Sequence, residues 1–189
     1  DAHGLGVLGE HGRGTAEHFG LENEVDIYMG TFSKSLASLG GYMASTAEVA
    51  EYVRHTSRPF IFSASITPAS VACALKSLEI LENEPQRVKA LQDISMYMRK
   101  KLKEKGVKII ESTTPIIPIF TYDDMATFKA CMILQDKGVY VNPVVSPAVP
   151  VGQSLLRTSY TATHTKEQMD EASEKIAETL KELGLISIS

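Results

Sequence analysis

Apolar residues recur along this 189-residue chain in two patterns. Short runs bounded by glycine, proline or polar residues are typical of strands, and longer segments with apolar residues three or four positions apart are typical of helices. The two patterns alternate, which predicts an α/β or α+β fold. We expect strands over residues 25–29, 41–44, 60–62, 107–111, 116–122, 139–141 and 155–159, and helices over residues 46–55, 68–84, 86–105, 124–137 and 165–183.

Three of the expected helices begin with capping signals. Thr46 stands before the first, and Thr67 followed by Pro68 stands before the second. Thr165, with Gln168 three residues later, resembles a capping box before the last. Hydroxyl side chains accept hydrogen bonds from the free amides of a helix start, and proline is tolerated at the first helical position.

The pattern changes partway along the chain. Pro85 interrupts the helical segments, and after Gly106 the sequence reads as a small α+β unit. We therefore expect two domains, over residues 1–84 and 85–189. The chain begins at an aspartate rather than a methionine, and we expect it to be the C-terminal half of a longer protein.

Composition excludes several classes of protein. The hydrophobic content of 43% fits a globular fold, and no apolar run approaches the roughly 20 residues of a membrane-spanning helix. The net charge of −4 gives no basic face for nucleic acid, and we interpret the basic residues at 99–105 as a solvated helix end. Cys73 and Cys131 form no CxxC pair, so we expect small buried thiols in a cytoplasmic protein, with neither a disulfide nor a metal site.

Residues 4–9 match the G-x-G-x-x-G pattern of dinucleotide sites. That chemistry requires a strand before the glycines and a helix that opens at them. Further glycines follow at positions 12, 14 and 20, with charged residues between them, which favours a loop. A Gly-rich nucleotide-binding module is kept as the non-enzymatic alternative.

Three residues have side chains that suit catalysis or binding. Lys34 follows an expected strand among hydroxyl residues, so it is either a surface lysine or the amine of a Schiff base. His3 is a ligand, an acid–base group or a hydrogen-bonded core residue. Arg157 lies in an apolar strand, where a buried guanidinium needs either a structural acid or a substrate carboxylate.

Four stretches together resemble the α-oxoamine synthase family, with spacings that agree along the whole chain. They are residues 1–14 (DAHGLGVLGEHGRG), 30–34 (GTFSK), 58–65 (RPFIFSAS) and 157–165 (RTSYTATHT). The resemblance implies fold-type I enzymes that use pyridoxal 5′-phosphate to condense an amino acid with an acyl-CoA. It also implies that residues 1–84 end the large cofactor domain and that residues 85–189 form the small C-terminal domain.

The resemblance assigns roles to individual residues. Lys34 would hold the cofactor as a Schiff base and move the α-proton of the amino acid. His3 would hydrogen-bond the phenolic oxygen of the cofactor. Thr31 and Ser33 would contact the phosphate or support the lysine, and Ser63 would reach the phosphate across a dimer interface. Arg157 would hold the substrate carboxylate.

Within the family, the stretches around residues 31–41, 62–70 and 139–150 look most like bacterial members that condense L-serine with palmitoyl-CoA to give 3-ketosphinganine, CoA and CO2. The resemblance then implies a homodimer. Glycine with acetyl-CoA (2-amino-3-ketobutyrate CoA ligase) and alanine with a pimeloyl thioester (8-amino-7-oxononanoate synthase) remain the alternative reactions.

Overall fold

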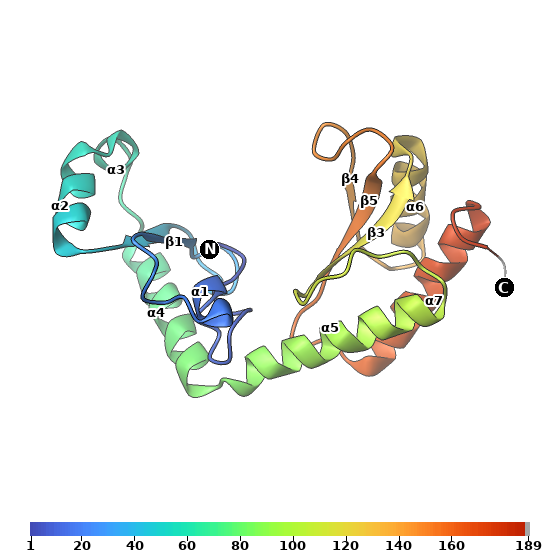
Figure 1. Ribbon diagram of the computed structural model, residues 1–189, viewed down its shortest axis with the longest axis horizontal. Helices are drawn as coiled ribbons and strands as arrows, with labels where there is room; N and C mark the ends of the chain where they lie inside the picture. Colours follow the sequence, from blue (N-terminus) through green and yellow to red (C-terminus); the bar gives the residue numbers. More distant parts are fainter. Residues whose placement is uncertain (188–189) are drawn as a thin grey trace. The chain divides into compact units, whose positions relative to one another are not determined.

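The computed structural model describes residues 1–187, and its chain divides into two compact units, residues 1–89 and 90–189 (Figure 1). The first unit contains α1 (Thr15–Phe19), β1 (Tyr28–Thr31), β2 (Gly41–Ala44), α2 (Ala47–Thr56), α3 (Arg58–Phe62) and α4 (Pro68–Asn83). The second contains most of α5 (Gln86–Glu104), followed by β3 (Ile116–Tyr122), α6 (Asp124–Asp136), β4 (Asn142–Val144), β5 (Ser154–Ser159) and α7 (Lys166–Glu182).

In the first unit, β1 and β2 form an antiparallel pair in which Thr31 lies opposite Gly41. The helix that follows is capped as the sequence predicts, because Thr46 accepts a hydrogen bond from the Val49 amide. α4 is also capped as predicted, by the Thr67 hydroxyl, which accepts from the Ser70 amide at 3.2 Å. The threonine hydroxyls satisfy amides that the first helical turn leaves without partners.

The strand predicted at residues 60–62 is wrong, since this segment is the short helix α3. Pro59 lies in its first turn, where the fixed φ of proline favours helix. Phe60 and Phe62 are 66% and 83% exposed, so no strand partner covers them within the described residues. The strand predicted at 25–29 forms later, as β1, and α1 was not predicted.

In the second unit, the sheet has the antiparallel order β3-β5-β4. On one face Ile119 lies opposite Leu156, and both side chains are fully buried. α6 packs against this sheet and against α7. Buried apolar residues of the helices complete the core: Met98 and Leu102 of α5, Ala130 and Leu134 of α6, and Ile176 and Leu180 of α7. α7 starts with the predicted capping box of Thr165 and Gln168.

Two strand predictions in the second unit are wrong. Residues 107–111 contribute only one isolated bridge, between Ile109 and Ile119. The strand expected at 139–141 lies three residues later in the chain, as β4, which includes Pro143. Proline is tolerated there because β4 is an edge strand of the sheet. The domain assignment to residues 1–84 and 85–189 stays a prediction.

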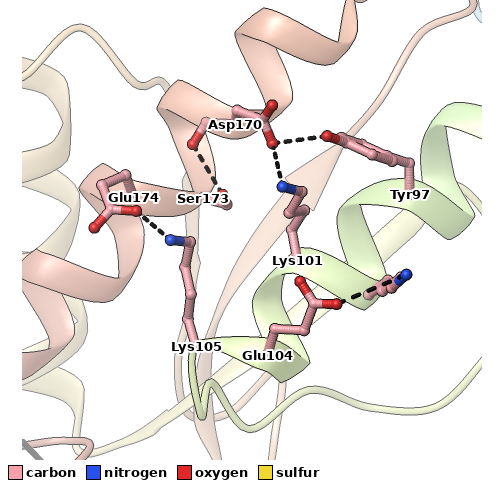
Figure 2. A network of polar contacts seen from close by, with 8 residues as sticks. Tyr97, Lys101, Glu104, Lys105, Asp170, Ser173 and Glu174 are labelled. Carbon is pink, nitrogen blue, oxygen red and sulfur yellow. Dashed lines mark hydrogen bonds and ion pairs between the residues drawn. The ribbon is translucent and has the colours of Figure 1, made fainter. Parts of the chain in front are cut away.

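The basic end of α5 is not simply solvated. Arg99 is 8% exposed, and its guanidinium donates to the carbonyl oxygens of Ile110, Thr114 and Ile116 and to the Ser112 hydroxyl. Lys101 and Lys105, which are about one turn apart on α5, lie against α7 (Figure 2). There Lys101 pairs with Asp170 at 2.8 Å and Lys105 pairs with Glu174. These ion pairs are partly exposed, so solvent screens them and they contribute little to stability.

The cysteine prediction is wrong in part. Both thiols are free, but Cys73 is exposed and Cys131 is only half-buried. Burial raises the pKa of the Cys131 thiol. Among the described residues, no helix has the length and the apolar character that a membrane span requires.

Candidate active site

The loop between β1 and β2 carries Lys34. The Phe32 amide donates to the Gly40 carbonyl at 2.9 Å, and the Ser38 amide donates to the Phe32 carbonyl at 2.8 Å, which closes the loop at its base. Leu36 is 3% exposed and anchors the loop in the unit. The loop is therefore a folded turn rather than a flexible connection.

The Lys34 side chain is exposed, and its Nζ donates to Thr31 Oγ1 at 3.4 Å. Ser33 is exposed as well, one position before the lysine. The structure thus brings a primary amine and two hydroxyls together on one short segment. This donor set can attach an aldehyde and can hydrogen-bond phosphate oxygens.

The Lys34 loop is fastened to α4 by two contacts. Ser38 Oγ donates to the Ser70 carbonyl at 2.6 Å, and Cys73 Sγ donates to the Ala37 carbonyl at 3.4 Å. Ala37 has a φ of 49°, which is uncommon for a residue other than glycine. The contacts to α4 hold the loop in this conformation.

His3 is exposed and lies in a turn that leads into the Gly-rich segment. The Asp1 carboxylate fixes both ends of this segment, because it accepts from the Thr15 amide at 2.7 Å and from the Thr15 hydroxyl at 2.6 Å. A Cβ at Gly4 or Gly14 would lie 1.9 Å or 2.0 Å from this carboxylate. The two glycines are therefore required for the close approach of Asp1.

The loop predicted for the Gly-rich stretch is confirmed over residues 4–14, whereas residues 15–19 form the helix α1. The dinucleotide interpretation is wrong on both of its structural requirements. The residues before Gly4 form a turn rather than a strand, and α1 is a helix of five residues that begins only at Thr15. Gly4, Gly9 and Gly14 give space to the carboxylates of Asp1 and Glu17.

Ser63 is the C-cap residue of α3 and is exposed. It follows Phe62, whose ring is also exposed. Its role at a second subunit, which the resemblance implies, stays a prediction.

Arg157 lies in β5 of the second unit and is half-buried, so the prediction of a buried arginine is only partly right. Its partners in register are Pro118 on β3 and Asn142 on β4. Residues directly opposite each other share a face of the sheet, so Arg157 lies on the face opposite to Leu156 and the helices that cover it. Within the described residues its guanidinium has no acidic partner, which leaves it available to a carboxylate ligand.

Sequence reasoning missed Glu17. This residue lies in α1, and its carboxylate accepts from the Arg13 amide at 2.9 Å, the His11 amide at 3.1 Å and His11 Nδ1 at 2.6 Å. Glu17 occupies the third helical position, as the glutamate of a capping box does, but its carboxylate accepts from amides that precede the N-cap residue Gly14. The sequence shows Glu17 three residues after Gly14. This spacing becomes a signal only once a helix is predicted to begin after Gly14.

Pyridoxal phosphate fits the chemistry of these donors. Lys34 would supply the amine for its aldehyde, Thr31 and Ser33 would supply hydroxyls for its phosphate, and His3 would supply an imidazole for its phenolic oxygen. All four residues belong to the first unit. Arg157 belongs to the second unit.

Known proteins match this chain over nearly its whole length. The model of the aminotransferase class I and II family matches residues 1–176. Serine palmitoyltransferase of Sphingobacterium spiritivorum is 52% identical over 188 residues, which are 100% of this chain and 47% of that protein. The 8-amino-7-oxononanoate synthase of Thermosipho melanesiensis is 42% identical over 186 residues, 98% of this chain and 48% of that protein.

A solved structure of SPT with its PLP internal aldimine superimposes with a TM-score of 0.93 at 34% identity, and the match covers 98% of this chain and 47% of that structure. The mixed α/β fold is thus that of this fold-type I PLP enzyme. The chain spans about half the length of the curated relatives it matches.

Proposed function

Because the chain belongs to the aminotransferase class I and II family, we propose that it carries the catalytic lysine of a pyridoxal-phosphate enzyme that condenses L-serine with a long-chain acyl-CoA, with palmitoyl-CoA as the expected substrate. The observation that carries the proposal is Lys34, an exposed amine held 3.4 Å from the Thr31 hydroxyl in a closed loop after β1. Identity of 52% with a serine palmitoyltransferase supports the choice of substrates.

In this proposal each residue has a defined chemical task. Lys34 Nζ holds the cofactor through its aldehyde, and later takes the proton from Cα of the amino acid. Thr31 and Ser33 hold the phosphate, and His3 donates a hydrogen bond to the phenolic oxygen. When bound, the cofactor supplies an electron sink that makes the Cα proton of the amino acid acidic.

Arg157 binds the serine carboxylate, since a guanidinium can grip both carboxylate oxygens. In the net reaction, a bond forms between serine Cα and the carbonyl carbon of the thioester, and the carbon–sulfur bond breaks. CoA leaves as the thiol, the serine carboxylate leaves as CO2, a proton takes its place on Cα, and 3-ketosphinganine is the product. We expect a homodimer, in which Ser63 of one subunit completes the phosphate site of the other.

Alanine with a pimeloyl thioester is the second candidate reaction, because an 8-amino-7-oxononanoate synthase is 42% identical over the same residues. The Lys34 chemistry would be the same in both reactions. The choice between them depends on which amino acid and which acyl chain are bound.

Release of CoA thiol by the full-length protein tests the proposal. Serine, glycine and alanine are each offered with palmitoyl-CoA, acetyl-CoA and pimeloyl-CoA. We expect release with serine and palmitoyl-CoA. Release only with alanine and pimeloyl-CoA, or only with glycine and acetyl-CoA, would move the enzyme to another reaction of the same chemistry, and no release in any pairing would refute the proposal.

A further inference from the structure

The Gly-rich segment of the first unit is held by two carboxylates, one that joins its two ends and one that binds amides within it. Asp1 binds Thr15, and Glu17 gathers the amides of His11 and Arg13 together with the His11 ring. The Glu17 side chain is 10% exposed. A buried carboxylate with several donors fixes the backbone that carries those donors.

The glycines of this segment are placed to admit Glu17. A Cβ at Gly9 would lie 2.0 Å from Glu17 Oε2, and Gly9 has a φ of 86°. Only glycine meets both conditions without displacing the carboxylate. The backbone around Gly9 and the Glu17 carboxylate therefore depend on each other.

The segment held by Glu17 also contacts the lysine loop. The Gly6 amide donates to the Gly12 carbonyl at 2.7 Å, and Gly12 lies between His11 and Arg13, the two residues whose amides Glu17 binds. A Cβ at Gly6 would lie 2.5 Å from Ser35 Cβ. Ser35 is the residue after Lys34, so a continuous set of contacts runs from Glu17 to the lysine loop.

We propose that Glu17 is a positioning residue, which holds the Gly-rich segment against Ser35 and thereby fixes the loop that presents Lys34. The proposal rests on the proposed function, in which Lys34 binds the cofactor. Glu17 acts through the backbone and touches neither substrate nor cofactor.

The ionisation of Glu17 agrees with this role. Burial works against its charge, but hydrogen bonds from the Arg13 amide and from the His11 ring and amide outweigh burial and lower the pKa of Glu17. The carboxylate therefore stays charged at neutral pH and accepts all of these donors. An amide side chain could not, because its NH2 group would face a donor.

The test compares Glu17→Gln with Glu10→Gln in the full-length protein. Glu10 lies in the same segment, is exposed, and has no side-chain hydrogen bond or ion pair within the described residues. Both variants lose one negative charge, so a difference between them reports the contacts of Glu17. Two readouts need no turnover: amide hydrogen exchange at residues 6–13, and the dissociation constant of pyridoxal phosphate.

In Glu17→Gln we expect amide exchange at residues 11–13 and the cofactor dissociation constant each to rise about tenfold over Glu10→Gln. We also expect kcat to fall about tenfold while the amino-acid KM stays within about twofold, because the serine carboxylate is assigned to Arg157. Equal exchange or equal cofactor affinity in the two variants would overturn the role of Glu17. Failure of the proposed function is recognised separately, because the unmutated protein would then release no CoA thiol in any substrate pairing.

A second variant covers the case in which Glu17→Gln folds poorly. Glu17→Ala leaves a gap lined by the amides of His11 and Arg13, which formate can enter. Recovery of most of the lost cofactor affinity in formate, but not in chloride at equal ionic strength, supports the proposal. Equal affinity in the two salts contradicts it.

Discussion

Different interactions stabilise each of the two units of the chain. In the second unit Ile119, Leu156 and Leu180 are fully buried, and they belong to a larger apolar core. In the first unit, the buried apolar side chains among the described residues are Leu36, Ala74 and Val88. There Leu39 and Phe62 are 71% and 83% exposed, although both are large and apolar.

The comparison shows what fixes the geometry in each unit. Burial of apolar surface determines the second unit, which presents Arg157 on the face of its sheet opposite to Leu156. In the first unit, hydrogen bonds to Asp1 and Glu17 and close contacts at glycines determine the positions of His3 and Lys34. We therefore expect mutations in the first unit to affect catalysis more than stability. Core mutations in the second unit should affect stability more than catalysis.

Lys34→Ala is expected to give the largest effect. Loss of the amine should lower kcat by about 10³-fold and should abolish covalent fixation of pyridoxal phosphate by borohydride. The midpoint of urea unfolding should change little, because the side chain is exposed. Lys76→Ala, at an exposed lysine of α4, is the control and should keep both properties. Retention of turnover by Lys34→Ala would refute its catalytic role.

Leu156→Ala should have the opposite effect. Its side chain is fully buried against β3, so the free energy of unfolding should fall by about 3 kcal/mol, as measured by urea denaturation. The kcat per folded molecule should stay within about twofold, because Leu156 faces away from Arg157. Met96→Ala, at a site 60% exposed in the same unit, is the control. A loss below about 1 kcal/mol for Leu156→Ala would contradict the described core.

Arg157→Ala should change binding more than folding. The amino-acid KM should rise by about 30-fold, since a charged hydrogen bond contributes about 2 kcal/mol, and the acyl-CoA KM should stay nearly constant. Steady-state kinetics with each substrate varied in turn measures both constants. Arg157→Lys keeps the charge but loses the bidentate geometry. Its amino-acid KM should therefore lie between those of the unmutated protein and Arg157→Ala. Equal increases in both KM values would exclude the carboxylate role.

Tyr160 should give the smallest effect, and only in alkali. Burial raises its pKa to about 12, although its hydrogen bond to Thr158 and the nearby charge of Arg99 oppose the increase. Between pH 10 and 12 the unfolded chain releases this proton and the folded chain keeps it, so stability falls as the pH rises. From pH 10 to 11 the free energy of unfolding, measured with urea, should fall by about 1 kcal/mol more in the unmutated protein than in Tyr160→Phe. Parallel pH profiles of the two proteins would contradict this.

Much of the secondary structure was readable from the sequence, because local signals determine it. Thr46, Thr67 and Thr165 cap helices as expected, and β2 and β3 have the predicted bounds. The errors occur where local signals compete with packing. α3 formed where Phe60 and Phe62 suggested a strand, since a strand needs a partner that local sequence does not provide.

The sequence by itself determined the alternation of strands and helices, the place of Lys34 after a strand and the hydroxyls around it. These depend on residues close together in the chain. Only the tertiary structure decided that the glycines admit Asp1 and Glu17, that Arg99 is buried and that Gly6 lies against Ser35. Each of these depends on the approach of groups separated along the chain, and a close approach is a property of the folded backbone rather than of any local sequence pattern.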